Sequence, residues 1–253
     1  PTTTPIVVPV DATSDVSNVV AITTSQVTFR EGLVGALSRI NPVFAAMNSV
    51  DSDISSLIYE GLTHTNNYGE PQPLLASRWV VSSDGLEYVF TLRDDVLWQD
   101  GTPFTTADVA YTMSILRDAA FPGDPEVGRF WRTVETEVLG EHIVRFRLTQ
   151  PLGTFLDQLQ IGILPEHALR GTNAQQIASH PINLSPVGTG AYQLDSITLA
   201  ADGVPQQVTL RAASTYRARP EAADRYEIEY VAFTLFPTFE TAAAAFENGE
   251  IDA

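Results

Sequence analysis

Residues 84–109 read DGLEYVFTLRDDVLWQDGTPFTTADV, and the hydrophobic period changes once along this stretch. Large apolar side chains at 88, 90 and 92 alternate with Glu87, Val89, Thr91 and Arg93, which is the period of two of a strand with one buried face. Asp84-Gly85 lies between this run and the run 78–81. A D-G pair between two such runs predicts a β-hairpin, because glycine adopts the positive φ of a tight turn.

The second half of the stretch has the spacing of a helix. Residues 96–98 predict a further short strand that ends at Asp100-Gly101. Thr105 is followed three residues later by Asp108, which resembles a capping box with Asp in the place of Glu. Four further residues then follow at helical spacing, as on one face of a helix. They are Val109, Thr112, Met113 and Leu116.

Residues 84–112 as a whole are similar to the signature segment of the family 5 extracellular solute-binding proteins. These proteins are the peptide-, dipeptide- and nickel-binding receptors of ABC importers. Residues 39–63, RINPVFAAMNSVDSDISSLIYEGLT, resemble the same family, as do PLLASRW at 73–79, PVGTGAY at 186–192 and GEIDA at 249–253. Ala191 stands where the family usually has proline. The resemblance extends from residue 27 to residue 253.

The resemblance implies an α/β fold with mixed sheets, a periplasmic-binding-protein-like lobe of type II in the peptide-binding cluster, with an inserted α+β subdomain. Residues 27–46 and 160–253 are expected to form the main part of an N-terminal lobe, and residues 47–159 the inserted subdomain. Residues 1–26 are rich in Thr, Val, Ser and Pro and predict a flexible tether or N-terminal arm. The C-terminal lobe that family members carry is expected to be absent.

Other local patterns complete the expected order of elements. A strand is expected to begin at Val27, and a helix is expected within residues 48–62, capped by Asp51 or Ser52 and ended by Gly61 in a left-handed conformation. Alternating runs predict two further hairpins, 134–139 with 143–148 and 192–199 with 207–212. The remaining patterns predict a helix within 151–159, a strand at 226–235 and a helix at 239–246.

Composition excludes several classes of function. The chain has 253 residues with a formal net charge of -17, which repels phosphate backbones and anionic lipid headgroups. We therefore expect no nucleic-acid partner, and a membrane association only through a possible lipid anchor outside this chain. The sequence contains no cysteine, which excludes disulfides, thiol catalysis and Cys-ligated metals. It has no apolar run long enough to span a bilayer.

Patterns for catalysis or metal binding are lacking. The four histidines have no metal-ligand spacing, so we expect neither a metal site nor a cofactor. Glu135 and Glu137 project from one face of one strand, as do Glu227 and Glu229, which favours solvated surfaces over an acid/base pair across a cleft. The run 188–190, Gly-Thr-Gly, lacks the Lys-Ser/Thr of a phosphate-binding loop. With no catalytic residue identified, we expect a protein that is not an enzyme.

Two stretches are candidates for ligand contact through the resemblance. The first comprises Asn48, Ser49, Val50 and Asp51, which approach a helix N-terminus, where N–H groups and polar side chains can hold a peptide. An ordinary loop would have the same sequence. The second is Phe130-Trp131, because an aromatic in this region of the family faces ligand. These aromatics would equally suit a hydrophobic core.

The resemblance implies the substrate-binding component of an ABC importer, which captures short peptides or a related small solute outside the cytoplasmic membrane. Its partners would be that small-molecule or peptide ligand and the ABC permease subunits. Its location would be extracytoplasmic, either periplasmic or lipid-anchored at the cell surface. A non-transport ligand sensor or interaction module on the same fold is the alternative. A hydrolase or lyase is a further one, although the sequence offers no nucleophile or acid/base pair for it.

Overall fold

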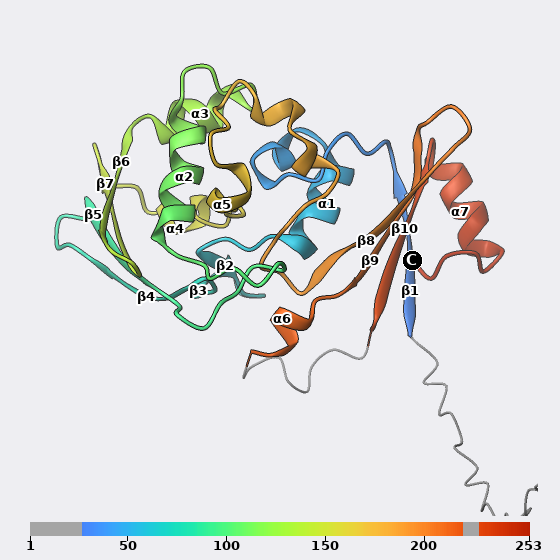
Figure 1. Cartoon of the computed structure of the whole chain (residues 1–253), viewed down its shortest axis with the longest axis horizontal. Helices are drawn as coiled ribbons and strands as arrows, with labels where there is room; N and C mark the ends of the chain where they lie inside the picture. Colours follow the sequence, from blue (N-terminus) through green and yellow to red (C-terminus); the bar gives the residue numbers. More distant parts are fainter. Residues whose placement is uncertain (1–26, 220–227) are drawn as a thin grey trace, which may run out of the picture.

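The computed structural model describes residues 27–219 and 228–253. The tether expected at 1–26 and the strand residues expected at 226 and 227 lie outside the described residues. The fold is mixed α/β. Two four-stranded sheets lie at opposite ends of the molecule, and most of the helices lie between them (Figure 1).

One sheet has the strand order β1-β10-β9-β8. Its strands are β1 (Thr28–Val34), β8 (Tyr192–Leu199), β9 (Pro205–Ala212) and β10 (Tyr230–Phe236). The predicted β8–β9 hairpin is confirmed, with Gly203 at φ 85° in its turn. Strand β1 pairs in parallel with β10, so strands from both ends of the described residues lie in one sheet. Helix α7 (Phe239–Glu247) covers the outer face of this sheet (Figure 1).

The other sheet has the order β4-β5-β7-β6, with every neighbouring pair antiparallel. Its strands are β4 (Ala76–Val81), β5 (Glu87–Leu92), β6 (Val134–Gly140) and β7 (Ile143–Leu148). Both predicted hairpins are confirmed. In β5 the alternation places Tyr88, Phe90 and Leu92 in the core, at 7%, 0% and 3% exposure. The opposite face carries ion pairs, so Glu137 binds Arg145 in the solvated surface that the sequence predicts.

Helix α2 (Thr106–Arg117) begins with the predicted capping box. The buried carboxylate of Asp108 accepts hydrogen bonds from the main-chain N–H of Thr105, at 3.0 Å, and of Glu166, at 2.9 Å. It also accepts one from the indole of Trp98, at 3.3 Å. Burial raises the pKa of Asp108, and these donors oppose the rise. The cap therefore also fixes the segment 96–98, which forms only a Leu97–Pro103 bridge in place of the expected strand.

The helix expected within 48–62 is α1 (Ser49–Ile58), preceded by the 3-10 helix η1 (Pro42–Met47). The predicted cap is wrong. Asn48 caps α1 by accepting the Val50 N–H at 3.0 Å, and Asp51 lies inside the first turn. The prediction for Gly61 is also wrong, because the helix ends at Ile58 and Gly61 does not have a positive φ. A Cβ on Gly61 would lie 2.6 Å from the main chain of Gln160, so glycine is required for close approach.

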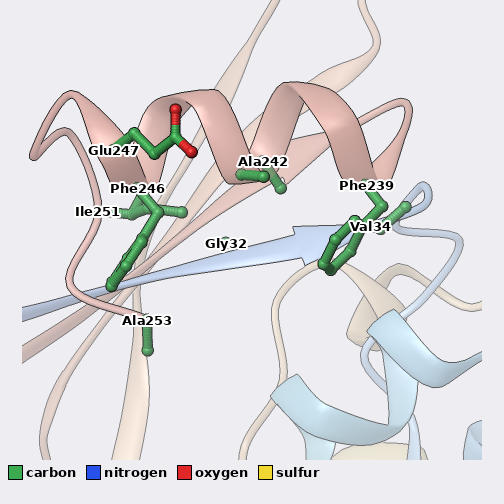
Figure 2. A pocket seen from close by; sticks show the side chains of 9 residues that line it. Gly32, Val34, Phe239, Ala242, Phe246, Glu247, Ile251 and Ala253 are labelled. Carbon is green, nitrogen blue, oxygen red and sulfur yellow. The ribbon is translucent and has the colours of Figure 1, made fainter.

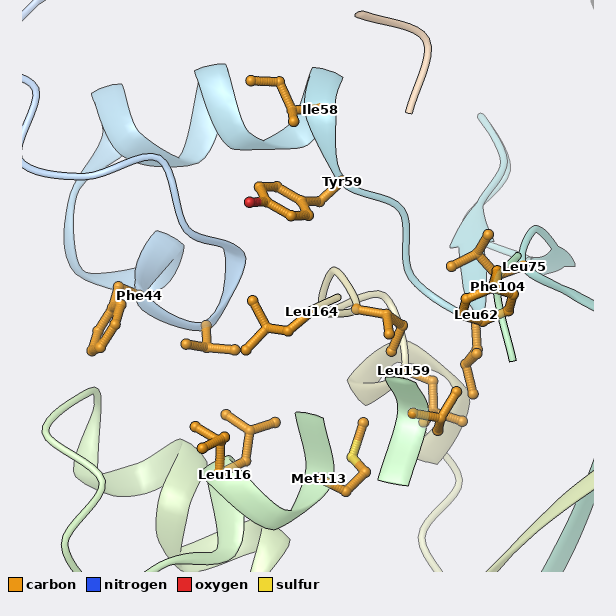
Figure 3. Close-up of a cluster of buried hydrophobic side chains, with 14 of the residues drawn as sticks. Phe44, Ile58, Tyr59, Leu62, Leu75, Phe104, Met113, Leu116, Leu159 and Leu164 are labelled. Carbon is orange, nitrogen blue, oxygen red and sulfur yellow. The ribbon is translucent and has the colours of Figure 1, made fainter. Parts of the chain in front are cut away.

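The hydrophobic core joins α1, η1 and α2 to the segment around residues 159–164 (Figure 3). Tyr59 and Leu164 lie near its centre, with Met113 and Leu116 below them (Figure 3). Helix α1 also contacts β8 of the first sheet, so residues on both sides of the predicted boundary share one core. The division into residues 27–46, 47–159 and 160–253 stays a prediction.

Shorter elements complete the fold. The helix expected within 151–159 is reduced to α4, a single turn. None of the helices in the described ranges is long and apolar enough to cross a membrane. The remaining elements are α3 (Pro125–Trp131), α4 (Phe155–Gln158), α5 (Glu166–Leu169), α6 (Ser214–Arg217), β2 (Thr63–Thr65), β3 (Pro71–Pro73), η2 (Ile177–Ser179) and η3 (Pro181–Asn183).

Candidate functional site

A cavity of about 440 Å³ opens where the loop after β1 meets the start of α1. Three of the four residues predicted for this stretch line it, and the fourth, Val50, turns into the core with 1% exposure. The lining combines hydroxyl, amide, carboxylate, guanidinium, thioether and aromatic groups. The lining residues are Ser38, Arg39, Phe44, Met47, Asn48, Ser49 and Asp51.

Two side chains of α1 and its cap hold the loop 35–39 in place. The amide nitrogen of Asn48 donates to the carbonyl of Ala36 at 2.9 Å and to the hydroxyl of Ser38 at 3.3 Å. The carboxylate of Asp51 accepts the main-chain N–H groups of Ser38, at 2.8 Å, and Arg39, at 3.2 Å. The loop and the helix N-terminus therefore form one rigid edge of the cavity.

Asp51 serves this edge as an acceptor for the main chain. The residue is 2% exposed, and burial raises the pKa of its carboxyl, while the two N–H bonds and, least, the charge of Arg39 oppose the rise. Both carboxylate oxygens already accept a main-chain N–H. We conclude that Asp51 shapes the cavity by fixing the loop.

Arg39 and Phe44 form the apolar and cationic part of the lining. The guanidinium carbon of Arg39 lies 4.6 Å from the centre of the Phe44 ring. That ring is 1% exposed and stacks on Phe121, with 5.7 Å between ring centres. Sequence reasoning missed both residues, together with Ser38 and Met47. Their only sequence signal is that they flank the predicted Ile-Asn-Pro turn at 40–42.

The second predicted pair lies elsewhere. Phe130 is half-buried and borders a separate cavity of about 150 Å³. Trp131 is 1% exposed and packs its ring against Phe146 and Phe155, at 6.2 and 6.3 Å between centres. Residues of the two predicted stretches thus line two separate cavities among those of the described residues. A ligand contact by Phe130 or Trp131 stays a prediction.

No group of three or more His, Asp or Glu side chains able to hold a metal occurs in residues 27–219 or 228–253. His167 forms a hydrogen bond with Asp100 through Nε2, at 2.7 Å, and its ring lies tilted beside that of Trp98, with 5.9 Å between centres. The lining at the start of α1 presents hydrogen-bonding groups and one cation, the guanidinium of Arg39.

A family model for the bacterial extracellular solute-binding proteins, family 5, middle region, matches residues 70–253. The chain belongs to this family. Family 5 proteins are solute-binding receptors, and the mixed α/β fold described above matches part of the fold of a solved structure.

Individual relatives of this family 5 chain are consistent with its membership in the family. A Brucella ovis protein with a provisional name as an ABC transporter peptide-binding protein is 31% identical over 179 residues, which is 70% of this chain and 32% of that one. The glutathione-binding protein GsiB of Salmonella typhi is 30% identical, over 60% of this chain and 29% of its own. The crystal structure of NikZ from Campylobacter jejuni in complex with Ni(L-His) superimposes with a TM-score of 0.75 at 27% identity, covering 89% of this chain and 42% of that one. This chain thus spans about a third of the length of the curated relatives it matches.

The family motif at 186–192 explains how α1 is held against the sheet. The N–H of Gly190 donates to the carbonyl of Ile58, at the end of α1, over 2.8 Å. Arg219 forms a bidentate pair with Glu60, at 3.0 and 2.9 Å, and donates to the carbonyl of Thr189 at 2.8 Å. The side chains of Arg219 and Glu60 are 2% and 7% exposed. This buried network fixes the helix that carries the candidate cavity.

A second cavity, of about 420 Å³, lies between α7 and β1 of this family 5 chain (Figure 2). Its lining is almost wholly apolar. Phe239 and Phe246 border it with 74% and 55% exposure, and Glu247 is the one charged side chain in the lining. Because convergent polar groups are lacking there, the groove suits an apolar surface better than a polar solute.

Proposed function

We propose that this chain supplies one wall of the solute site of an ABC importer's substrate-binding protein, and that the solute is a short peptide or a related small molecule. The observation that carries the proposal is the cavity at the start of α1. Its walls are a loop held by hydrogen bonds, the capped start of a helix, and an arginine that lies over an aromatic ring. The cavity is concave, as ligand sites are, and its lining combines polar groups with the apolar side chains of Phe44 and Met47.

The proposed mechanism is capture without chemical change. A solute would lie against the edge formed by Ser38, Asn48 and Ser49, and would bond to polar and main-chain groups there. A second wall would close on it and exclude water by hinge motion between two rigid bodies. Membership in a family of solute-binding receptors supports binding over turnover.

The place and partners of the protein follow from the same proposal. We place it outside the cytoplasmic membrane, where it would deliver the solute to ABC permease subunits. The extracellular character of the family and the name of the Brucella ovis relative support this assignment.

Calorimetric titration of the chain with a mixed library of di- to pentapeptides tests the one-wall proposal. We expect only weak binding, because a single wall makes part of the contacts and leaves the solute open to water. Sub-micromolar binding by this chain would contradict the one-wall proposal. Absence of heat even at millimolar peptide would contradict peptide as the solute.

A further inference from the structure

We propose that Arg39 is a specificity-determining residue of the cavity at the start of α1, and that it recognises a carboxylate of the solute. The inference rests on the proposed function and adds the chemical class of the group that is bound. Its basis is the position of one guanidinium in the lining of a cavity, seated on an aromatic ring.

The main chain of Arg39 is fixed. Its N–H is held by Asp51, and its neighbour Ser38 is held by Asp51 and Asn48. The guanidinium then lies over the ring of Phe44, which is itself fixed by stacking on Phe121. When the flat face of a guanidinium lies on an aromatic ring, the N–H groups at its edge remain available for two parallel hydrogen bonds to a carboxylate. The side chain is therefore ordered before a solute arrives.

The guanidinium of Arg39 has no ion-pair partner in the described residues. No carboxylate of residues 27–219 or 228–253 lies within ion-pair distance of it, although most arginines in these ranges have such a pair. Asp51 is the acidic group of the same cavity, and its two oxygens are occupied by main-chain donors. Arg39 is half-buried in the lining of a cavity, without an ion pair to the described residues, in a chain with 31 acidic and 14 basic residues. This cation can therefore attract an anionic group of the solute, which the net negative charge of the chain would otherwise repel.

The competing explanation is that Arg39 only covers Phe44. If Arg39 only covers Phe44, its replacement should change the affinity for every solute equally. If it binds a carboxylate, its replacement should change the affinity only for solutes that carry one. The two explanations therefore differ in a ratio of affinities, and this ratio does not depend on how weakly the chain binds.

The test is an NMR titration of the 15N-labelled chain with three probes at millimolar concentration. The probes are trialanine, its C-terminal amide, and an N-acetylated Ala-Asp-Ala amide. The variants are Arg39→Gln, Arg39→Lys and the control Arg78→Gln, which removes an exposed arginine on β4. The spectra also report whether each variant is folded.

We expect trialanine to shift the amide signals of residues 38–51 and to bind at least about tenfold more tightly than its amide, since a bond to a charged group contributes about 1.5–3 kcal/mol. Arg39→Gln should bring the ratio of the two affinities close to one, because the carboxylate then gains no charged partner. Arg39→Lys should retain part of the preference for trialanine, and Arg78→Gln all of it. If the Ala-Asp-Ala amide binds like trialanine, any carboxylate is accepted; if it binds like trialanine amide, the α-carboxylate is required.

Two outcomes overturn the inference in distinguishable ways. If trialanine and its amide bind equally to the unaltered chain at residues 38–51, or if Arg39→Gln weakens both equally, the cavity binds solute but Arg39 does not select a carboxylate. If no probe shifts these residues, the proposed function of the cavity fails together with the inference.

Discussion

Replacement of Glu60 by alanine is expected to lower the free energy of unfolding by about 3–5 kcal/mol, the range for breaking a buried ion pair by removing one partner. The variant leaves the guanidinium of Arg219, which is 2% exposed, without its carboxylate. Urea unfolding followed by circular dichroism measures the change. Since Arg219 also holds the carbonyl of Thr189, the loss should extend to the contact between α1 and β8.

The matched control is Glu126→Ala, which removes the carboxylate from an ion pair with Arg129 whose side chains are 73% and 67% exposed. Exposed pairs contribute about 0–1 kcal/mol, so this variant should unfold almost as the unaltered chain does. A double variant with methionine at both 60 and 219 should recover part of the loss, because it leaves no unpaired buried charge. If Glu60→Ala and Glu126→Ala lower the free energy of unfolding by the same small amount, the stabilising role of the Glu60–Arg219 pair is contradicted.

Replacement of Gly188 by alanine is expected to destabilise the chain by about 3 kcal/mol or more, at the upper end for overpacking. A Cβ at this position would lie 1.8 Å from the carbonyl oxygen of Ile58 and 2.6 Å from its carbon. The clash is with main chain at the end of α1, which cannot rotate away as a side chain can. The midpoint of thermal unfolding should fall by about 6–12 °C for a chain of this size.

Gly153→Ala is the control for this substitution. Gly153 is exposed, has no positive φ, and a Cβ there would meet no atom within 4 Å. Its unfolding midpoint should stay close to that of the unaltered chain, since surface changes lie within about 0.5 kcal/mol. If the two alanine variants unfold at the same temperature, the close approach of residues 186–192 to α1 is not what requires glycine.

The hairpins and the start of α2 could be predicted from the sequence because their causes are local. Alternation in 88–92 and the D-G turn determine the β4–β5 pair, and Thr105 and Asp108 are close enough in sequence to complete a capping box by themselves. No distant residue is needed for either prediction.

The start and end of α1 could not be predicted in this way. Asn48, Asp51 and Ser52 are all suitable caps, and what distinguishes them is the loop 35–39, whose main chain occupies Asp51. The position of Gly61 in the sequence suggests a helix terminator. Glycine is required there because the main chain of Gln160, which is distant in the sequence, leaves no room for a Cβ.

The candidate site was predictable only in part for the same physical reason. The residues 48–51 belong to a stretch with a recognisable pattern, and three of them line the cavity. Arg39 and Phe44 are part of the lining because the ring of Phe44 stacks on Phe121 and the Arg39 guanidinium lies over it. The contact between Phe44 and Phe121 joins distant segments, and the periodicity of the sequence does not predict it. Trp131 shows the opposite case, since an aromatic suited to a ligand site is buried in the core.

The most direct test of the central proposal places a fluorescent reporter at the start of α1. The sequence contains no cysteine, so Ser49→Cys provides a single site for an environment-sensitive dye, and Ser83→Cys provides a matched exposed control in the β4–β5 turn. We predict that the peptide library changes the fluorescence of the label at 49, in a saturable manner, and leaves the label at 83 unchanged. A response of equal size at both positions, or a response at neither, would contradict a solute site at this cavity.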